Sequence, residues 1–97
     1  MKYEWDENKR IINLKKHGID FQESHEIFNN PMLTKIDRSP DYGEDRYIGL
    51  GVTHKCVVLI IFTEPNEEKI RIISIRKATK QERKIYEKYL KDRLEKT

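Results

Sequence analysis

The chain has 97 residues and carries 20 Lys/Arg against 17 Asp/Glu, a formal net charge of +3. This length suits a single domain over residues 1–97, and the 36% hydrophobic content permits folding because the apolar residues are grouped into periodic segments. The lone cysteine, Cys56, excludes an internal disulfide and suits a buried thiol in a reducing compartment. Since neither a signal peptide nor an apolar run of ~18 residues is present, we expect a cytoplasmic protein that is not bound to a membrane.

The positive charge is concentrated in the C-terminal half. Residues 1–45 hold 7 Lys/Arg and 10 Asp/Glu, net −3, whereas residues 46–97 hold 13 Lys/Arg and 7 Asp/Glu, net +6. Such a half favours polyanions, nucleic acid above all. A lysine-rich helix is also typical of a solvated face, so charge alone leaves both interpretations open.

The chain begins with a predicted strand and helix. Residues 2–5 are typical of a short strand. Asp6 and Gly18 bracket a helix over residues 7–17, as its N-cap and its left-handed C-terminal residue. The apolar side of this helix is marked by Ile11 and Leu14.

A second, shorter helix follows. Asp20 and Glu23 form its capping pattern, and the segment before Pro31 ends it. Its core-facing side chains are Phe21, Ile27 and Phe28. Residues 32–36 predict a strand, and residues 37–45 predict a polar, turn-rich loop.

The next segments predict an antiparallel meander. Residues 46–52 alternate bulky side chains with a nearly bare face, which a helix or a nucleotide can approach closely; the residues of that face are Tyr47, Gly49 and Gly51. Residues 57–62 form a wholly apolar strand, residues 64–69 a polar hairpin loop, and residues 70–75 the next strand.

A last helix over residues 80–96 opens with the capping box of Thr79 and Glu82. Its apolar side chains are Tyr86, Leu90 and Leu94 at four-residue spacing, with Ile85 and Tyr89 beside them. The complete pattern predicts an α+β fold: a short N-terminal strand and two helices, an antiparallel β-sheet meander, and a C-terminal helix.

Two arginines interrupt the apolar strand at residues 70–75 and its continuation. A buried arginine is unfavourable unless an anion meets it, and a guanidinium group binds two phosphate oxygens at once, so the strand indicates a phosphate-binding surface. The sequence contains no closely spaced His, Asp and Glu set typical of a metal site, and we expect neither a metal nor a cofactor. Attack by a ribose 2′-hydroxyl on its own phosphate then needs a base, an acid and cations.

Arg71 and Arg76 are the strongest candidates for these cations, followed by Arg46 and Lys77. The alternative is that they form ion pairs on the surface of the fold, with Glu44, Asp45 or Glu64 as partners. Strict alternation places Arg71 and Arg76 on opposite faces of the sheet, so both serve one site only if the strand ends or twists near Ile75.

A histidine and a tyrosine are candidates for proton transfer and phosphate binding. Histidine side chains have an ordinary pKa of about 6.5, suited to proton transfer, which makes His17 a candidate, although a histidine ending a helix also complements the helix dipole. Tyr86 is placed to donate a hydrogen bond to phosphate, and equally to pack its ring in the core. His25 and His54 are further candidates.

Several motifs together resemble the BrnT family of toxins from bacterial type II toxin–antitoxin systems. They are Glu4-Trp5-Asp6, Asn13, Lys16-His17-Gly18, Glu44-Asp45-Arg46, Ile70–Thr79, Glu82 and Tyr86. Two positions depart from the family pattern: Ile75, where a small residue is usual, and Pro65, where a basic one is usual.

The resemblance implies a RelE-like fold and a ribonuclease that inhibits translation. It also implies a BrnA-like antitoxin with a ribbon-helix-helix domain, assembled with the toxin as a heterotetramer that binds operator DNA only through the antitoxin. The site residues expected for RNA cleavage are Arg71, Arg76, His17 and Tyr86, with RNA contacts from Arg46, Lys77 and Lys16. The alternative function is a non-catalytic module that binds nucleic acid or protein through the same basic sheet.

Overall fold

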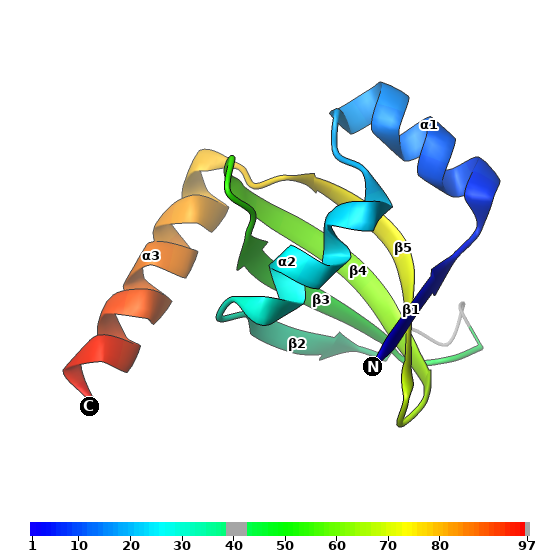
Figure 1. Cartoon of the computed structure of the whole chain (residues 1–97). Helices are drawn as coiled ribbons and strands as arrows, with labels where there is room; N and C mark the ends of the chain where they lie inside the picture. Colours follow the sequence, from blue (N-terminus) through cyan, green and yellow to red (C-terminus); the bar gives the residue numbers. More distant parts are fainter. Residues whose placement is uncertain (39–42, 97) are drawn as a thin grey trace.

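The structure, a computed structural model, describes residues 1–38 and 43–96 and confirms the α+β class (Figure 1). In chain order the elements are β1 (Lys2–Trp5), α1 (Glu7–His17), a 3₁₀ turn η1 (Phe21–Glu23), α2 (Ser24–Asn29), β2 (Leu33–Asp37), β3 (Arg46–Val52), β4 (Val57–Asn66), β5 (Lys69–Lys77) and α3 (Lys80–Glu95). Part of the loop expected over residues 37–45 lies outside the described residues.

The strands form one mixed sheet in the order β1-β5-β4-β3-β2. The expected antiparallel meander is confirmed for β3, β4 and β5, and β1 adds a parallel edge to β5. The predicted hairpin loop over residues 64–69 is wrong, because β4 continues to Asn66 and leaves only residues 67–68 as the turn. A register irregularity between Thr63 and Asn66 accommodates Pro65, which has no N–H to donate to the ladder.

The predicted helix termini are confirmed. The side chain of Asp6 accepts a hydrogen bond from the backbone N–H of Lys9, and Gly18 ends α1 with φ 73°. The capping box of Asp20 and Glu23 is present, but it opens the 3₁₀ turn rather than α2 itself.

One face of the sheet, the covered face, carries the larger core. Its buried apolar side chains are Ile19, Phe21, Ile27, Val58, Ile60, Phe62, Ile70, Ile72 and Ile75. Figure 1 shows α2 lying across the sheet, and a Cβ atom at Gly51 would lie 3.0 Å from Cγ2 of Ile27 on α2. The bare face of β3 is therefore the place where a helix approaches the sheet, one of the two outcomes that the sequence allowed.

The expected apolar side of α1 is wrong. Ile11 and Leu14 are 41% and 38% exposed, whereas the buried residue of α1 is Asn13. The amide of Asn13 donates to the carbonyls of Ile19 and Ile75 and accepts from the N–H of Ile75, at 3.2, 2.8 and 3.2 Å. Helix α1 is thus joined to β5 through a buried polar contact.

Helix α3 extends away from the sheet toward the C-terminus (Figure 1). Its capping box of Thr79 and Glu82 is confirmed, but Ile85 and Leu94 are exposed, so only part of the expected apolar side is buried. The packed part is held by two phenols, because Tyr86 donates to the Pro31 carbonyl at 2.7 Å and Tyr89 donates to the Met32 carbonyl at 3.2 Å. None of the described helices is long and apolar enough to cross a membrane.

Candidate functional site

The second face of the sheet, the open face, is incompletely covered by α3. It carries a smaller cluster whose buried members are Leu50, Leu59 and Tyr86. At the end of the sheet away from α3, the strand register aligns one residue from each strand. Asp37 pairs with Arg46, Arg71 pairs with both Thr63 and Glu4, and the pairing of Tyr47 with Phe62 places Arg46 beside Thr63. We call these five residues the charged row, in the order Asp37, Arg46, Thr63, Arg71 and Glu4. Their neighbours in sequence, including Tyr47, Phe62 and Ile72, pack in the covered core, so alternation directs the row to the open face.

A β-bulge brings Arg71 and Arg76 to the same face. Phe62 pairs with Ile72 and Ile61 pairs with Ser74, so β5 contains one extra residue at this point. As a result Ile72 and Ile75, three positions apart, both lie in the covered core. Arg71 and Arg76, which flank this segment in the sequence, therefore share the open face. The irregularity near Ile75 that a common site requires is therefore present.

Arg71 forms an ion pair with Glu4 on the neighbouring strand. Nη2 of Arg71 lies 3.2 Å from Oε1 of Glu4, and the two side chains are 44% and 38% exposed. Beside them Thr63 is buried, and its Oγ1 has no hydrogen-bond partner among the described residues. This end of the row therefore combines a solvent-accessible guanidinium group with an accessible carboxylate and an unsatisfied hydroxyl.

Arg76 is held more firmly by Glu82 of α3. Nη1 and Nη2 of Arg76 donate to Oε1 and Oε2 of Glu82 at 2.8 and 3.0 Å, and the backbone N–H of Thr79 donates to Oε1. The Arg76 guanidinium lowers the pKa of Glu82 from 4.5 to about 2, with a smaller contribution from Thr79. Arg71 and Arg76 thus form ion pairs within the fold, although their partners are Glu4 and Glu82 and not the three acidic residues suggested by the sequence.

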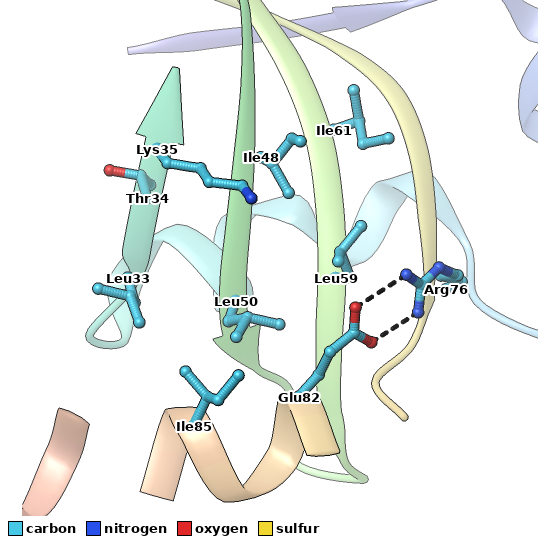
Figure 2. Close-up of a pocket in the computed structure, with 10 residues that line it drawn as sticks. All are labelled: Leu33, Thr34, Lys35, Ile48, Leu50, Leu59, Ile61, Arg76, Glu82 and Ile85. Atoms are coloured by element: carbon cyan, nitrogen blue, oxygen red, sulfur yellow. Dashed lines mark hydrogen bonds and ion pairs between the residues drawn. The ribbon is translucent and has the colours of Figure 1, made fainter. Parts of the chain in front are cut away.

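An apolar groove of about 620 Å³ lies between the open face and α3 (Figure 2). Its lining residues are Leu33, Thr34, Lys35, Ile48, Leu50, Leu59, Ile61, Arg76, Glu82 and Ile85. Figure 2 shows the Arg76–Glu82 pair at one side of the groove and Lys35 at the other. The charged row and the apolar groove therefore share one face of the sheet.

The remaining candidates lie apart from this row. Tyr86 is buried, and its hydroxyl is engaged by Pro31, the arrangement of a packed core tyrosine. His17 is half-buried at the end of α1, and Lys16 and Lys77 are exposed. The described contacts connect none of these four side chains to Arg71 or Arg76, and their roles in RNA cleavage stay predictions.

The other two histidines lie on helix α2 or contact it. His25 packs edge-on against Tyr3, with ring centroids 4.4 Å apart, and Nδ1 of His54 lies 3.0 Å from Oε2 of Glu26. Among residues 1–38 and 43–96, no three His, Cys, Asp or Glu side chains gather as a metal-binding group.

Sequence reasoning missed Glu4, Thr63 and Glu82 as members of the open face. Glu4 lies in a predicted strand, Thr63 directly follows one, and Glu82 belongs to a predicted helix cap. Their proximity to an arginine becomes apparent only once the chain is folded. The register between β1 and β5 in particular joins residues from opposite ends of the chain.

Comparison with known proteins bears on this site. A family model described as "Ribonuclease toxin, BrnT, of type II toxin-antitoxin system" matches residues 5–82. The chain belongs to the BrnT family. The match contains four members of the charged row, Asp37 to Arg71, and ends at Glu82, in the first turn of α3.

A solved structure supports the same assignment. The ribonuclease toxin BrnT of Brucella abortus, described at 1.1 Å resolution, superposes with a TM-score of 0.62 and 28% sequence identity, over 82% of this chain and 99% of the Brucella chain. A search of curated protein sequences gives no match. Membership of the BrnT family makes this chain a type II toxin, with RNA as its substrate and an antitoxin as its partner.

Proposed function

We propose that this BrnT toxin is an endoribonuclease that cleaves RNA without a metal ion, by attack of a ribose 2′-hydroxyl on the adjacent phosphate. The observation that carries the proposal is the charged row, in which Arg46 and Arg71 lie on either side of Thr63 on an open sheet face. Guanidinium groups fixed on a sheet offer two-point contacts to a phosphate whose negative charge grows in the transition state.

The two best candidate arginines have different roles in this proposal. Arg71 is accessible and held by a single contact to Glu4, so we assign it to the scissile phosphate. Arg76 is held by both oxygens of Glu82, so RNA has to compete with that carboxylate for it. We therefore assign Arg76 either to the binding of a flanking phosphate or to holding the site in its geometry. The exposed lysines Lys16 and Lys77 are assigned to the same roles.

The products of cleavage test the chemistry. Attack by the 2′-hydroxyl leaves a 2′,3′-cyclic phosphate, or a 3′-phosphate after its hydrolysis, together with a 5′-hydroxyl end. We expect purified toxin to yield these ends in the presence of excess EDTA. Loss of cleavage on chelation, or a 3′-hydroxyl product, means that a metal-activated water does the chemistry instead.

We further propose that the partner is a BrnA-like ribbon-helix-helix antitoxin, assembled with the toxin as a heterotetramer that binds operator DNA through the antitoxin. The open face supports a particular mode of neutralisation. Its apolar groove, lined by Arg76 and Lys35 and lying on the same face as the charged row, fits an amphipathic antitoxin segment with apolar side chains on one part and carboxylates on another. Such a segment covers the groove and the charged row together.

Growth of the host cell separates this proposal from a non-catalytic binding module. Induced expression of the toxin alone is expected to stop growth by inhibiting translation in the cytoplasm, and co-expression of the antitoxin is expected to restore it. A module that only binds nucleic acid or protein is expected to be tolerated at the same expression level. RNA from arrested cells then supplies the cleaved ends for analysis.

A further inference from the structure

We propose that Glu4 is the general base that takes the proton from the ribose 2′-hydroxyl. The inference rests on the proposed ribonuclease function and names a catalytic residue for it. Glu4 lies in β1. Tyr3 and Trp5, on either side of it, pack against the covered core, so Glu4 faces the opposite side of the sheet.

The parallel pairing of β1 with β5 places this carboxylate next to the proposed phosphate site. Glu4 and Arg71 are partners in the strand register, and the ion pair between them joins the end of the charged row to its centre. With its side chain 38% exposed, Glu4 is open to a substrate. A nucleotide whose phosphate lies on Arg71 therefore presents its ribose within reach of Glu4.

The hydrogen bonds of Glu4 leave it able to accept a proton. Oε1 accepts one bond from Arg71, and Oε2 accepts none among the described residues. Glu82, the carboxylate beside Arg76 on this face, has both oxygens engaged, and the Arg76 guanidinium holds its pKa at about 2. A carboxylate with so low a pKa is a poor base, because catalytic efficiency rises as the pKa of the base approaches the working pH.

Glu4 takes the proton of the 2′-hydroxyl while the 2′-oxygen forms a bond to phosphorus, and the bond from phosphorus to the 5′-oxygen breaks. The 5′-oxygen takes a proton from water, and protonated Glu4 returns its proton to the solvent. Arg71 stabilises the additional negative charge on the phosphate oxygens while the pentacoordinate state exists.

Substitution Glu4→Gln tests this assignment, with Glu87→Gln as the matched control. Glu87 is an exposed carboxylate on α3, away from the charged row, so its variant shows the effect of removing one negative charge. Single-turnover cleavage by Glu4→Gln is expected to fall by about 10²- to 10⁴-fold, the usual contribution of a general base. Cleavage by Glu87→Gln is expected to match that of the unmodified toxin.

Binding of RNA and the pH profile distinguish a base from a structural partner of Arg71. RNA with 2′-O-methyl riboses has no proton to lose, and Glu4→Gln is expected to bind it as tightly as the unmodified toxin, or more tightly, because Arg71 loses its competing carboxylate. The residual cleavage by Glu4→Gln is expected to respond to pH differently from cleavage by the unmodified toxin, because the variant has lost the proposed base.

Several outcomes overturn the inference. One is a Glu4→Gln variant that cleaves RNA at the rate of the unmodified toxin. Another is a Glu4→Gln variant that loses cleavage and 2′-O-methyl RNA binding to the same extent. If Asp37→Asn abolishes cleavage and Glu4→Gln does not, the base lies at the opposite end of the row. If Glu4→Gln does not fold, Glu4→Asp decides, since it retains the carboxylate at a shorter reach, and an unchanged rate contradicts the proposal. An unmodified toxin that yields 3′-hydroxyl ends overturns the proposed function itself.

Discussion

Asn13 and Ile75 are 62 positions apart, yet the side-chain amide of Asn13 makes both hydrogen bonds to the backbone of Ile75. The register of β1 with β5 ends at Ile72, and the bulge follows. The Asn13 amide therefore pairs with the backbone N–H and C=O of Ile75 at the edge of β5 that β1 no longer covers. This contact fixes the stretch of β5 that carries Arg76. A polar contact in helix α1 thus supports the geometry of the open face.

We expect Asn13→Ala to lower the free energy of unfolding by about 2–3 kcal/mol, because buried backbone groups of Ile75 and Ile19 lose their partner. Asn13→Asp is expected to be worse at neutral pH, since a carboxylate facing two carbonyls is unfavourable. That extra cost is expected to shrink as pH is lowered and to be lost by about pH 4, because the buried site favours the protonated acid in the folded protein. Urea unfolding measures both effects.

The matched control is Asn8→Ala on the same helix, where the asparagine is exposed. Removing this side chain leaves no buried group unsatisfied, so its free energy of unfolding is expected to stay within about 0.5 kcal/mol of the parent. Equal unfolding curves for Asn8→Ala and Asn13→Ala are incompatible with a structural role for Asn13.

Arg71→Ala and Arg76→Ala are each expected to abolish toxicity while leaving a folded protein that binds the antitoxin. Each removes a cation from the proposed phosphate site without emptying the apolar core, since both side chains lie outside the buried cluster. Lysine at either position is expected to restore activity only in part, because a point charge does not replace a two-point contact. Growth arrest and cleavage in vitro measure the effect.

Arg83→Ala provides the control, because Arg83 is exposed on α3 and no ion pair is found for it among the described residues. Its toxicity is expected to equal that of the parent. If soluble Arg71→Ala and Arg76→Ala both still arrest growth, the assignment of the site to the open face is wrong.

The sequence predicted the elements of this fold better than their contacts. Asp6, Gly18 and Thr79 act through neighbours in the chain, so their roles as helix caps were predictable. The bulge in β5 was not, because Ile-Ile-Ser contains neither glycine nor proline to mark it. It depends on the pairing of β4 with β5, and without it alternation separates the two arginines.

The same difference between local signals and long-range pairing explains which residues of the candidate site were predictable. Arg71 and Arg76 were found because charge inside an apolar strand is visible in the sequence. Glu4 reaches Arg71 only through the parallel pairing of β1 with β5, which no local pattern specifies. A buried asparagine on α1 was also unpredictable, because a polar residue in a helix is usually exposed and the backbone that Asn13 satisfies lies on a distant strand.

The Arg76–Glu82 pair predicts a dependence of stability on pH. The pKa of Glu82 in the folded protein, about 2, lies below its ordinary value of 4.5. Its contribution is therefore fully present above about pH 4.5 and is lost as pH falls toward 2. The difference in free energy of unfolding between the parent and Glu82→Gln is expected to be largest near neutral pH and to shrink through this range.

Glu87→Gln is the control, because Glu87 is exposed. We expect its free energy of unfolding to differ little from that of the parent at every pH. If the free energies of unfolding of the two variants change with pH in parallel, the pairing of Arg76 with Glu82 does not stabilise the fold.

The apolar groove predicts how the antitoxin is held. Ile85 lines the groove and is 52% exposed, whereas Ile12 on α1 is 64% exposed and lies outside it. If an amphipathic antitoxin segment occupies the groove, Ile85→Asp buries a carboxylate against Leu50 and Leu59 on binding. We expect it to weaken antitoxin binding by about 10- to 100-fold.

Titration calorimetry with purified antitoxin measures this loss, and inhibition of RNA cleavage at increasing antitoxin concentration measures its consequence. Ile85→Asp is expected to cleave RNA at the parent rate, because Ile85 lies outside the charged row, yet to require more antitoxin for inhibition. Ile12→Asp introduces the same charge on another exposed helical position and is expected to change neither quantity. If Ile85→Asp binds the antitoxin as tightly as Ile12→Asp does, the segment lies elsewhere, and the charged row must be neutralised without occupation of the groove.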